Sequence, residues 1–343
     1  MIFNRFLPDY GVLPSAYFKR SAISNPIELF WSDDLCSLLR LCGEGEENIG
    51  EGASDFDKFK AILRALPLLE GHPTRAWIAS LLEEYFDLKE FPQAENASEI
   101  WKLLCNRLLE NPLAPQDLVK GDWLCDGLTV STNLPEHVTP TLNANLLLET
   151  TSKKATDWSA EIAVTISHFK ENRCQKIVLQ LPDDFTFVTP SLYHVDRALS
   201  LSKKDREATN LLICQLVREL STVAQNEDML LAFVCNSNPD ALVSLLQYVE
   251  ESVGLPRVCW STRAAKEAHA LLTFTAKPHK REVLAALPYE IVMTNDELSS
   301  AIKSWQVRYP IGKLCFVTAC DLRQTPYARA HIDDMLQNSK TKL

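Results

Sequence analysis

The stretch DREATNLLICQLVRELSTVAQNEDMLLAFVC, residues 205–235, decides the fold, because a helix pattern and a strand pattern follow each other within it. Residues 205–224 carry apolar side chains at the spacing of an amphipathic helix. The run MLLAFVC at 229–235 is short, apolar and rich in β-formers, which is typical of a buried strand. A helix joined to a buried strand by a few polar residues is the repeating unit of an α/β fold.

The same alternation continues on both sides of this stretch. Helical patterns occupy Ala160–Lys170, Asp205–Ala224, Pro239–Glu251, Asp296–Trp305 and Tyr327–Leu336. Strand patterns occupy Trp123–Val130, Lys176–Leu181, Met229–Cys235, Arg257–Trp260, Leu271–Thr275, Glu290–Met293 and Lys313–Thr318. With an opening strand at Phe3–Pro8 these runs make eight strands, so the sequence predicts an α/β fold of the distorted (β/α)8 TIM-barrel type.

A mostly helical segment interrupts this pattern after the first strand. Ser54 and Asp55 precede an apolar stripe at helical spacing, and Pro73 and Ser98 each precede another. We therefore expect a single barrel domain over residues 1–343, with a helical insertion at 20–122 and the βα repeats at 123–338.

Composition excludes several classes of function. The net charge of −10 and the pI of about 5.3 argue against nucleic-acid binding, which requires a basic face. No apolar run approaches the ~18 residues that a membrane span needs. Ten cysteines without a C-x-x-C pair indicate free thiols in a reducing compartment, so we expect a cytoplasmic protein.

Several blocks of the sequence resemble the uronate isomerase family, metal-dependent members of the amidohydrolase superfamily that interconvert hexuronic aldoses and ketoses. The clearest are NPIELFWSDD (25–34), EGASDFDKFKAILRALP (51–67), GHPTRAWIASLLEEYFDL (71–88) and SEIWKLLCNRLLENPLAPQDLVKG (98–121). The resemblance implies a barrel with its site at the C-terminal ends of the strands and a divalent metal such as zinc. It also indicates a shortened member, because residues 150–230 match the family less well.

The residues that would carry the family's chemistry are changed. Asn4 and Phe6 stand where the family has the His-x-His of its first strand, and Phe6 has no donor atom for a metal. Ala76 and Ala79 replace two further histidines, and Asn143 stands at the place of a substrate-contacting arginine. Ser131–Pro135 aligns with an acidic family motif without its acids, and Trp260–Arg263 aligns with a Gly-Trp-Trp segment. We therefore predict no metal ligands and no cofactor.

One family element has two alignments. The family ends its eighth strand with an Asp-x-Arg motif; a one-residue shift gives Asp321 and Arg323, whereas the unshifted alignment puts Ala319 in the acidic place. The candidate catalytic residues are accordingly Asp321 and Arg323. The candidate binding residues, all at strand-end positions, are Asn4, Arg5, His137, Asn143, Trp260 and Arg263.

Two other polar groups have alternative interpretations. His194, Asp196 and Arg197 form either a polar site or a solvated loop, and a solvated loop is the simpler interpretation. Cys320 is either a reactive thiol beside Asp321 or a buried cysteine, and no histidine partner is identifiable for it.

Three functions are compatible with this sequence, so whether the chain is an enzyme stays open. The one that we favour is a uronate isomerase homologue that lacks the metal site, is inactive as an isomerase, and binds a sugar acid, another small metabolite or a partner protein, with a homo-oligomer also compatible. The second is an active isomerase of D-glucuronate or D-galacturonate, with ligands such as His137 or His194. The third is a metal-free reaction that uses Asp321 and Arg323.

Overall fold

A computed structural model of the chain describes residues 13–14, 22–70, 72–114, 121–130, 134, 136, 138–201, 203–235, 237–262, 269–289 and 314–318. The strands are β1 Leu13–Pro14, β2 Gly121–Leu124, β3 Val138–Asn143, β4 Lys176–Gln180, β5 Leu230–Val234, β6 Arg257–Ser261, β7 Val283–Tyr289 and β8 Leu314–Thr318. The α-helices are α2 Ile27–Phe30, α3 Asp33–Leu41, α4 Glu46–Ile49, α5 Asp55–Ala65, α6 Pro73–Phe86, α7 Ala97–Glu110, α8 Ala155–Glu171, α9 Leu192–Ser200, α10 Arg206–Asn226, α11 Pro239–Ser252 and α12 His269–Ala276. Short 3-10 helices are η1 Leu66–Leu69, η2 Ala94–Asn96 and η4 Ala144–Glu149.

The eight strands form one sheet whose order follows the chain, from β1 to β8. The pairs from β1 to β7 are parallel, with registers such as Lys176 opposite Leu230 and Ala232 opposite Cys259. Sequential parallel strands connected through helices are the topology of a (β/α)8 barrel. The helices α2–α7 fall between β1 and β2, which is where the sequence predicted the insertion.

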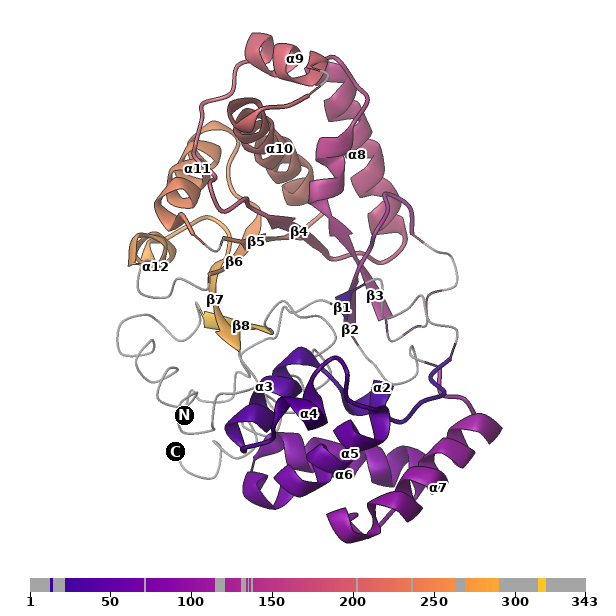
Figure 1. Ribbon diagram of the computed structural model, residues 1–343. Helices are drawn as coiled ribbons and strands as arrows, with labels where there is room; N and C mark the ends of the chain where they lie inside the picture. Colours follow the sequence, from indigo (N-terminus) through magenta and orange to yellow (C-terminus); the bar gives the residue numbers. More distant parts are fainter. Residues whose placement is uncertain are drawn as a thin grey trace, which may run out of the picture. The chain divides into compact units, whose positions relative to one another are not determined.

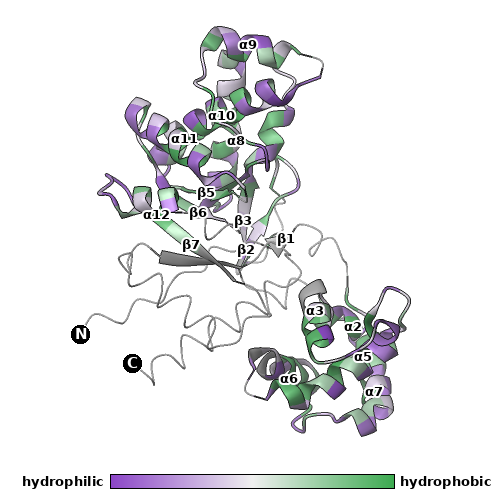
Figure 2. Ribbon diagram, turned by 60° about the vertical axis from the view of Figure 1, so that its left-hand side comes forward, coloured by the Kyte–Doolittle hydropathy of each residue, from purple (hydrophilic) through white to green (hydrophobic). Residues whose placement is uncertain are grey.

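The helices α8, α10, α11 and α12 lie on the outer side of the strands, and α9 packs against α8 and α10 (Figure 1). The helices α8, α10 and α11 each carry both hydrophobic and hydrophilic residues (Figure 2), as expected for helices with one buried face. Their buried residues, such as Ile162, Phe169 and Leu216, join one large apolar cluster with Leu179 and Phe233 of the strands. This layer between sheet and helices is the main core of the barrel.

The chain divides into two compact units, one with the strands and α8–α12 and the other with α2–α7. The helical unit has a core of its own around Phe59, Ile62 and Leu104. Its helix α5 begins where Ser54 accepts a hydrogen bond from the backbone N–H of Asp57 at 3.1 Å, because an N-cap side chain satisfies a donor that the helix leaves open. The domain boundaries at 20–122 and 123–338 stay predictions.

Several predicted elements differ from those observed. Leu271–Thr275, predicted as a strand, lies in the helix α12, where its buried residues 271, 272, 274 and 275 have helical spacing. The strand predicted at Trp123–Val130 is β2, which ends at Leu124, and the strand β3 was not predicted because it contains Pro140. The predicted strands at 3–8 and 290–293 and the predicted helices at 296–305 and 327–336 lie outside the described residues.

Within the part of the chain that the structure describes, none of the helices combines the length and the apolar character that a membrane crossing requires.

Candidate functional site at the strand ends

Alternate side chains of the strands β4–β7 belong to two separate apolar clusters. Positions such as Leu179, Leu231 and Trp260 join the core shared with the helices. The positions between them form a second cluster, made of Val178, Leu230, Ala232, Cys259, Leu284 and Ala286. Because successive side chains of a strand point to opposite faces, the second cluster faces the interior of the barrel.

The register places one level of this interior cluster in a row. Asn143 pairs with Val178, Val178 with Ala232, Ala232 with Cys259, and Cys259 with Leu284. The four residues on β4–β7 are at most 8% exposed. Across β3–β7, this level carries the amide of Asn143, the thiol of Cys259 and otherwise only hydrocarbon side chains.

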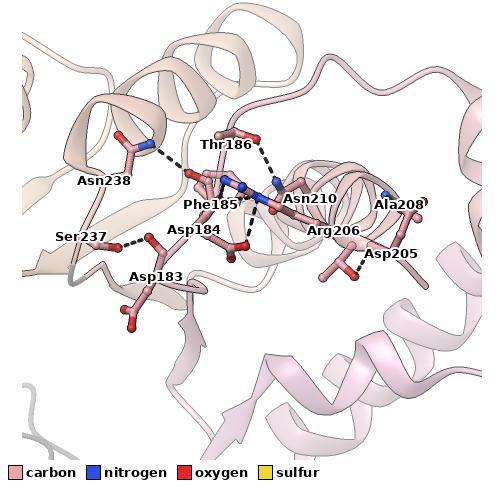
Figure 3. Close-up of polar contacts among 11 residues, drawn as sticks. Asp183, Asp184, Phe185, Thr186, Asp205, Arg206, Ala208, Asn210, Ser237 and Asn238 are labelled. Carbon is pink, nitrogen blue, oxygen red and sulfur yellow. Dashed lines mark hydrogen bonds and ion pairs between the residues drawn. The ribbon is translucent and has the colours of Figure 1, made fainter. Parts of the chain in front are cut away.

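Polar groups gather where β4 and β5 end, which is the edge of a barrel at which sites are built (Figure 3). Ser237, after β5, donates a hydrogen bond to the backbone oxygen of Asp183, after β4. The amide of Asn238 donates to the backbone oxygen of Phe185 at 3.0 Å. The guanidinium of Arg206, at the start of α10, lies 3.0 Å from the carboxylate of Asp184. These contacts fasten the loop after β4 to the loop after β5 and to α10.

A second set of contacts fastens β3 to β4. The side chain of Asn145 donates to the backbone oxygen of Gln180 at 2.8 Å and accepts from its N–H at 2.9 Å. The side-chain oxygen of Asn143 accepts from the N–H of Asn145 at 3.2 Å and so caps η4. Apart from the ion pair between Arg206 and Asp184, the side chains at both places bond to backbone groups, so these contacts hold the loops together.

Only two of the predicted site residues are described. Asn143 lies at the last position of β3, half-buried, at the interior level described above. Trp260 is fully buried on the helix-facing side of β6, and its indole N–H donates to the hydroxyl of Thr275 in α12 at 2.7 Å. Asn4, Arg5, His137, Arg263, Asp321 and Arg323 lie outside the described residues, and their roles stay predictions.

The first strand bears on the placement of Asn4 and Phe6. Its described part is Leu13–Pro14, which pairs with Trp123 and Leu124 of β2. Residues 3–8 lie outside the described ranges, so the assignment of Asn4 and Phe6 to metal-ligand positions of this strand stays a prediction.

The motif around His194 belongs to the helix α9, which sequence reasoning did not predict. Within it, the carboxylate of Asp196 accepts a hydrogen bond from the N–H of Ala155 at 2.6 Å, at the first residue of α8. Asp196 therefore positions the start of α8, which is a structural role.

Three of the described thiols have environments that suppress their reactivity. Burial raises the pKa of Cys125 to about 12 and the pKa of Cys174 and of Cys214 to about 11. Because the thiolate is the reactive form, these cysteines are inert packing residues at neutral pH. Cys320 lies outside the described residues.

The described donor groups do not fit a divalent metal. Among the described residues, no group of three His, Cys, Asp or Glu side chains is close enough together to hold one. The interior level offers the amide of Asn143 and the thiol of Cys259, whereas such metals are held by several imidazoles, thiolates or carboxylates. We derive no chemical step through a metal.

Sequence reasoning missed an ion pair between two strands. The ammonium group of Lys176, at the first residue of β4, lies 2.5 Å from a carboxylate oxygen of Asp122 in β2, and the Lys176 side chain is only 5% exposed. A lysine at the head of an otherwise apolar strand, KIVLQL, is the signal that could have drawn attention to it. The pair lies at the N-terminal end of the strands, where barrel residues serve stability rather than catalysis.

Comparison with known proteins relates the chain to the uronate isomerases. Residues 28–125 match the family described as glucuronate isomerase. The uronate isomerase of Streptococcus uberis is 36% identical over 108 residues, which are 31% of this chain and 23% of that protein. The uronate isomerase of Thermotoga petrophila is 26% identical over 201 residues, 49% of this chain and 43% of that protein. The matched parts thus span less than half of these relatives.

Two solved structures resemble the whole chain. The crystal structure of uronate isomerase from Thermotoga maritima matches with a TM-score of 0.68 and 16% identity, and covers 99% of this chain and 90% of that one. Glucuronate isomerase from Caulobacter crescentus matches with a TM-score of 0.56 and 12% identity, over 98% of this chain and 86% of that one. The predicted resemblance to uronate isomerases is confirmed over residues 28–125, and the predicted TIM-type fold is confirmed.

Proposed function

We propose that this protein is a uronate isomerase homologue that does not isomerise hexuronates. The observation that carries the proposal is the apolar level formed by Val178, Ala232, Cys259 and Leu284 beside Asn143. Aldose–ketose isomerisation moves a proton between two carbons, and the reaction requires a base and a group that polarises the carbonyl. Hydrocarbon side chains supply neither. Asn143, at the place of the family's substrate-contacting arginine, is uncharged and uses its oxygen to cap η4.

The expected result of an activity assay is no conversion of D-glucuronate or D-galacturonate above the uncatalysed rate, with or without added zinc, manganese or iron. Metal analysis of the purified protein is expected to give substoichiometric metal. Each kcal/mol of lost carbonyl polarisation lowers a rate about fivefold, so the loss of several makes turnover undetectable. The uronate isomerase of Thermotoga maritima, assayed in parallel, is the positive control.

Two outcomes would contradict the proposal and are distinguishable from each other. Stoichiometric metal together with turnover that a chelator removes would establish the metal-dependent isomerase. Turnover that persists in chelator and is lost in Asp321→Asn would establish the metal-free reaction with Asp321 and Arg323.

The second part of the proposal is that the rim of the barrel binds a sugar acid without turnover. The last inward positions of β3, β4 and β6 are the polar residues Asn143, Gln180 and Ser261, and the apolar Val234 of β5 lies in register between Gln180 and Ser261. Neutral groups that donate and accept hydrogen bonds suit a polyhydroxylated ligand. We also assign the protein to the cytoplasm, a proposal supported by the free thiols of the eight described cysteines.

Thermal unfolding in the presence of D-glucuronate or D-galacturonate tests this binding. A ligand at 100 times its dissociation constant adds about 2.7 kcal/mol, which raises Tm by roughly 3–5 °C for a chain of 343 residues. Gln180 is exposed, so Gln180→Leu is expected to fold normally and to reduce the shift. Glucose is the control for the acid group. No shift with any sugar acid, or an equal shift in Gln180→Leu, would contradict binding at this rim.

A further inference from the structure

A groove of about 810 Å³ lies away from the strand-end cluster, between the segment after β2, the 3-10 helix η4 and the helix α8. Its apolar lining includes Leu128, Leu146 and Val164, with the buried Trp158 beside them. Val164 is 71% exposed, although it lies within a helix that packs its other face into the core. We call this surface the acidic groove, because the charged residues that line it are acidic.

One wall of the acidic groove is a single face of α8. Asp157, Ala160, Glu161, Val164 and Thr165 all line it. Their spacing of three and four residues places them on one side of the helix, over a length of about 12 Å at 1.5 Å per residue. The opposite face of α8 packs Ile162, Ile166 and Phe169 into the core. The groove wall is therefore rigid and about two helical turns long.

Every charged residue that lines the groove is acidic: Asp126, Glu149, Asp157 and Glu161. They come from the segment after β2, from η4 and from α8. Glu161 is held in place by the hydroxyls of Ser152 and Thr150, which donate to its carboxylate at 2.5 and 2.6 Å. These hydrogen bonds, with that of Ser152 the stronger influence, lower the pKa of Glu161, so it stays ionised at neutral pH.

We propose that the acidic groove docks a basic, amphipathic segment of a partner protein. Such a segment, about two helical turns long, would place apolar side chains against Val164 and Leu128 and lysine or arginine side chains beside the four carboxylates. The charge complementarity selects this occupant, because basic side chains attract the four carboxylates, whereas an acidic segment would be repelled by them. The lining of this groove includes none of Asn143, Gln180 and Ser261, so the inference does not depend on whether the protein is an isomerase.

The test is a fluorescence-anisotropy titration of the full chain with a labelled helical peptide made of leucine and lysine. A peptide of the same length made of leucine and glutamate is the sequence control. We expect binding of the Leu/Lys peptide alone, and we expect it to weaken as salt is raised from about 50 to about 500 mM, because screening shortens the reach of exposed charges.

A pair of matched variants separates docking in the groove from general attraction to a chain with a net charge of −10. Val164→Lys puts a positive charge, like that of the lysines of the peptide, on the α8 wall of the groove and is expected to weaken binding at least about tenfold. Leu109→Lys changes the net charge equally at a residue of α7 that is 70% exposed, and is expected to bind as the parent does. Both positions are exposed on helices, so both variants are expected to fold.

Three outcomes would overturn the proposal. One is equal weakening by Val164→Lys and Leu109→Lys, which would show nonspecific attraction. Another is binding of the Leu/Glu peptide with similar affinity. The third is displacement of the Leu/Lys peptide by the small cation spermidine. This result would assign the groove to a small organic cation instead.

Discussion

Replacing Trp260 by alanine is expected to lower the free energy of unfolding by about 3–5 kcal/mol, the range for removing a large buried aromatic side chain. Trp260 is fully buried on the helix-facing side of β6 and packs within the main core of the barrel. Its indole N–H also donates to Thr275 at 2.7 Å, so the substitution removes a hydrogen bond between β6 and α12 as well as packing. Urea unfolding followed by far-UV circular dichroism measures the effect.

Two further variants separate packing from the hydrogen bond. Trp260→Phe keeps part of the volume and loses the N–H, so its expected cost is smaller, about 1–3 kcal/mol. Thr275→Val removes the acceptor and leaves the indole N–H buried without its partner, with an expected cost of about 1–3 kcal/mol. If Trp260→Ala changed the free energy of unfolding by less than about 0.5 kcal/mol, as surface substitutions do, the placement in the core would be wrong.

The case of Trp260 shows why the site was harder to predict than the fold. The alignment of Trp260 with a family position near the barrel mouth predicted its place along the strand. The face to which it points depends on register, and a shift by one residue exchanges the interior for the helix side. Cys259, its neighbour, is the residue of β6 that faces the interior at that level.

Strands and helices with a clean pattern were predicted well. The runs at 176–181, 229–235 and 257–260 coincide with β4, β5 and β6 to within a residue or so. A short apolar run between polar segments is typical of a buried strand. β3 was missed because Pro140 lacks the N–H of a ladder residue, yet it lies opposite Trp123 in the sheet. α12 was misassigned because LLTFT has the composition of a strand and the spacing of a helix.

Pairings between distant residues were beyond sequence reasoning altogether. Asp122 and Lys176 are 54 residues apart, and neither belongs to a motif. The groove beside α8 likewise joins Asp126 to Glu161 through the fold alone. A single sequence shows which residues prefer burial. Contacts between distant charged residues depend on the register of the sheet, which the sequence alone does not give.

The ion pair between Asp122 and Lys176 supports the second large prediction. Asp122→Leu is expected to lower the free energy of unfolding by about 3–5 kcal/mol, because it removes a carboxylate that compensates a buried ammonium group. Lys176→Met is expected to cost less, about 1–2 kcal/mol, because the Asp122 side chain is 27% exposed and its charge retains contact with water.

The double variant Asp122→Leu/Lys176→Met decides how the pair acts. Two apolar side chains of similar length fill the space without a buried charge, so the double variant is expected to be more stable than Asp122→Leu alone. Urea unfolding of the parent and the three variants gives the coupling energy, expected at about 1–3 kcal/mol for groups in direct contact. Additive effects of the two single substitutions would contradict a direct ion pair. We expect Asp122→Leu to be the less stable single variant because Lys176 is the more buried partner. If Lys176→Met were less stable instead, an unpaired carboxylate at Asp122 would cost more than an unpaired ammonium group at Lys176, which would contradict this explanation.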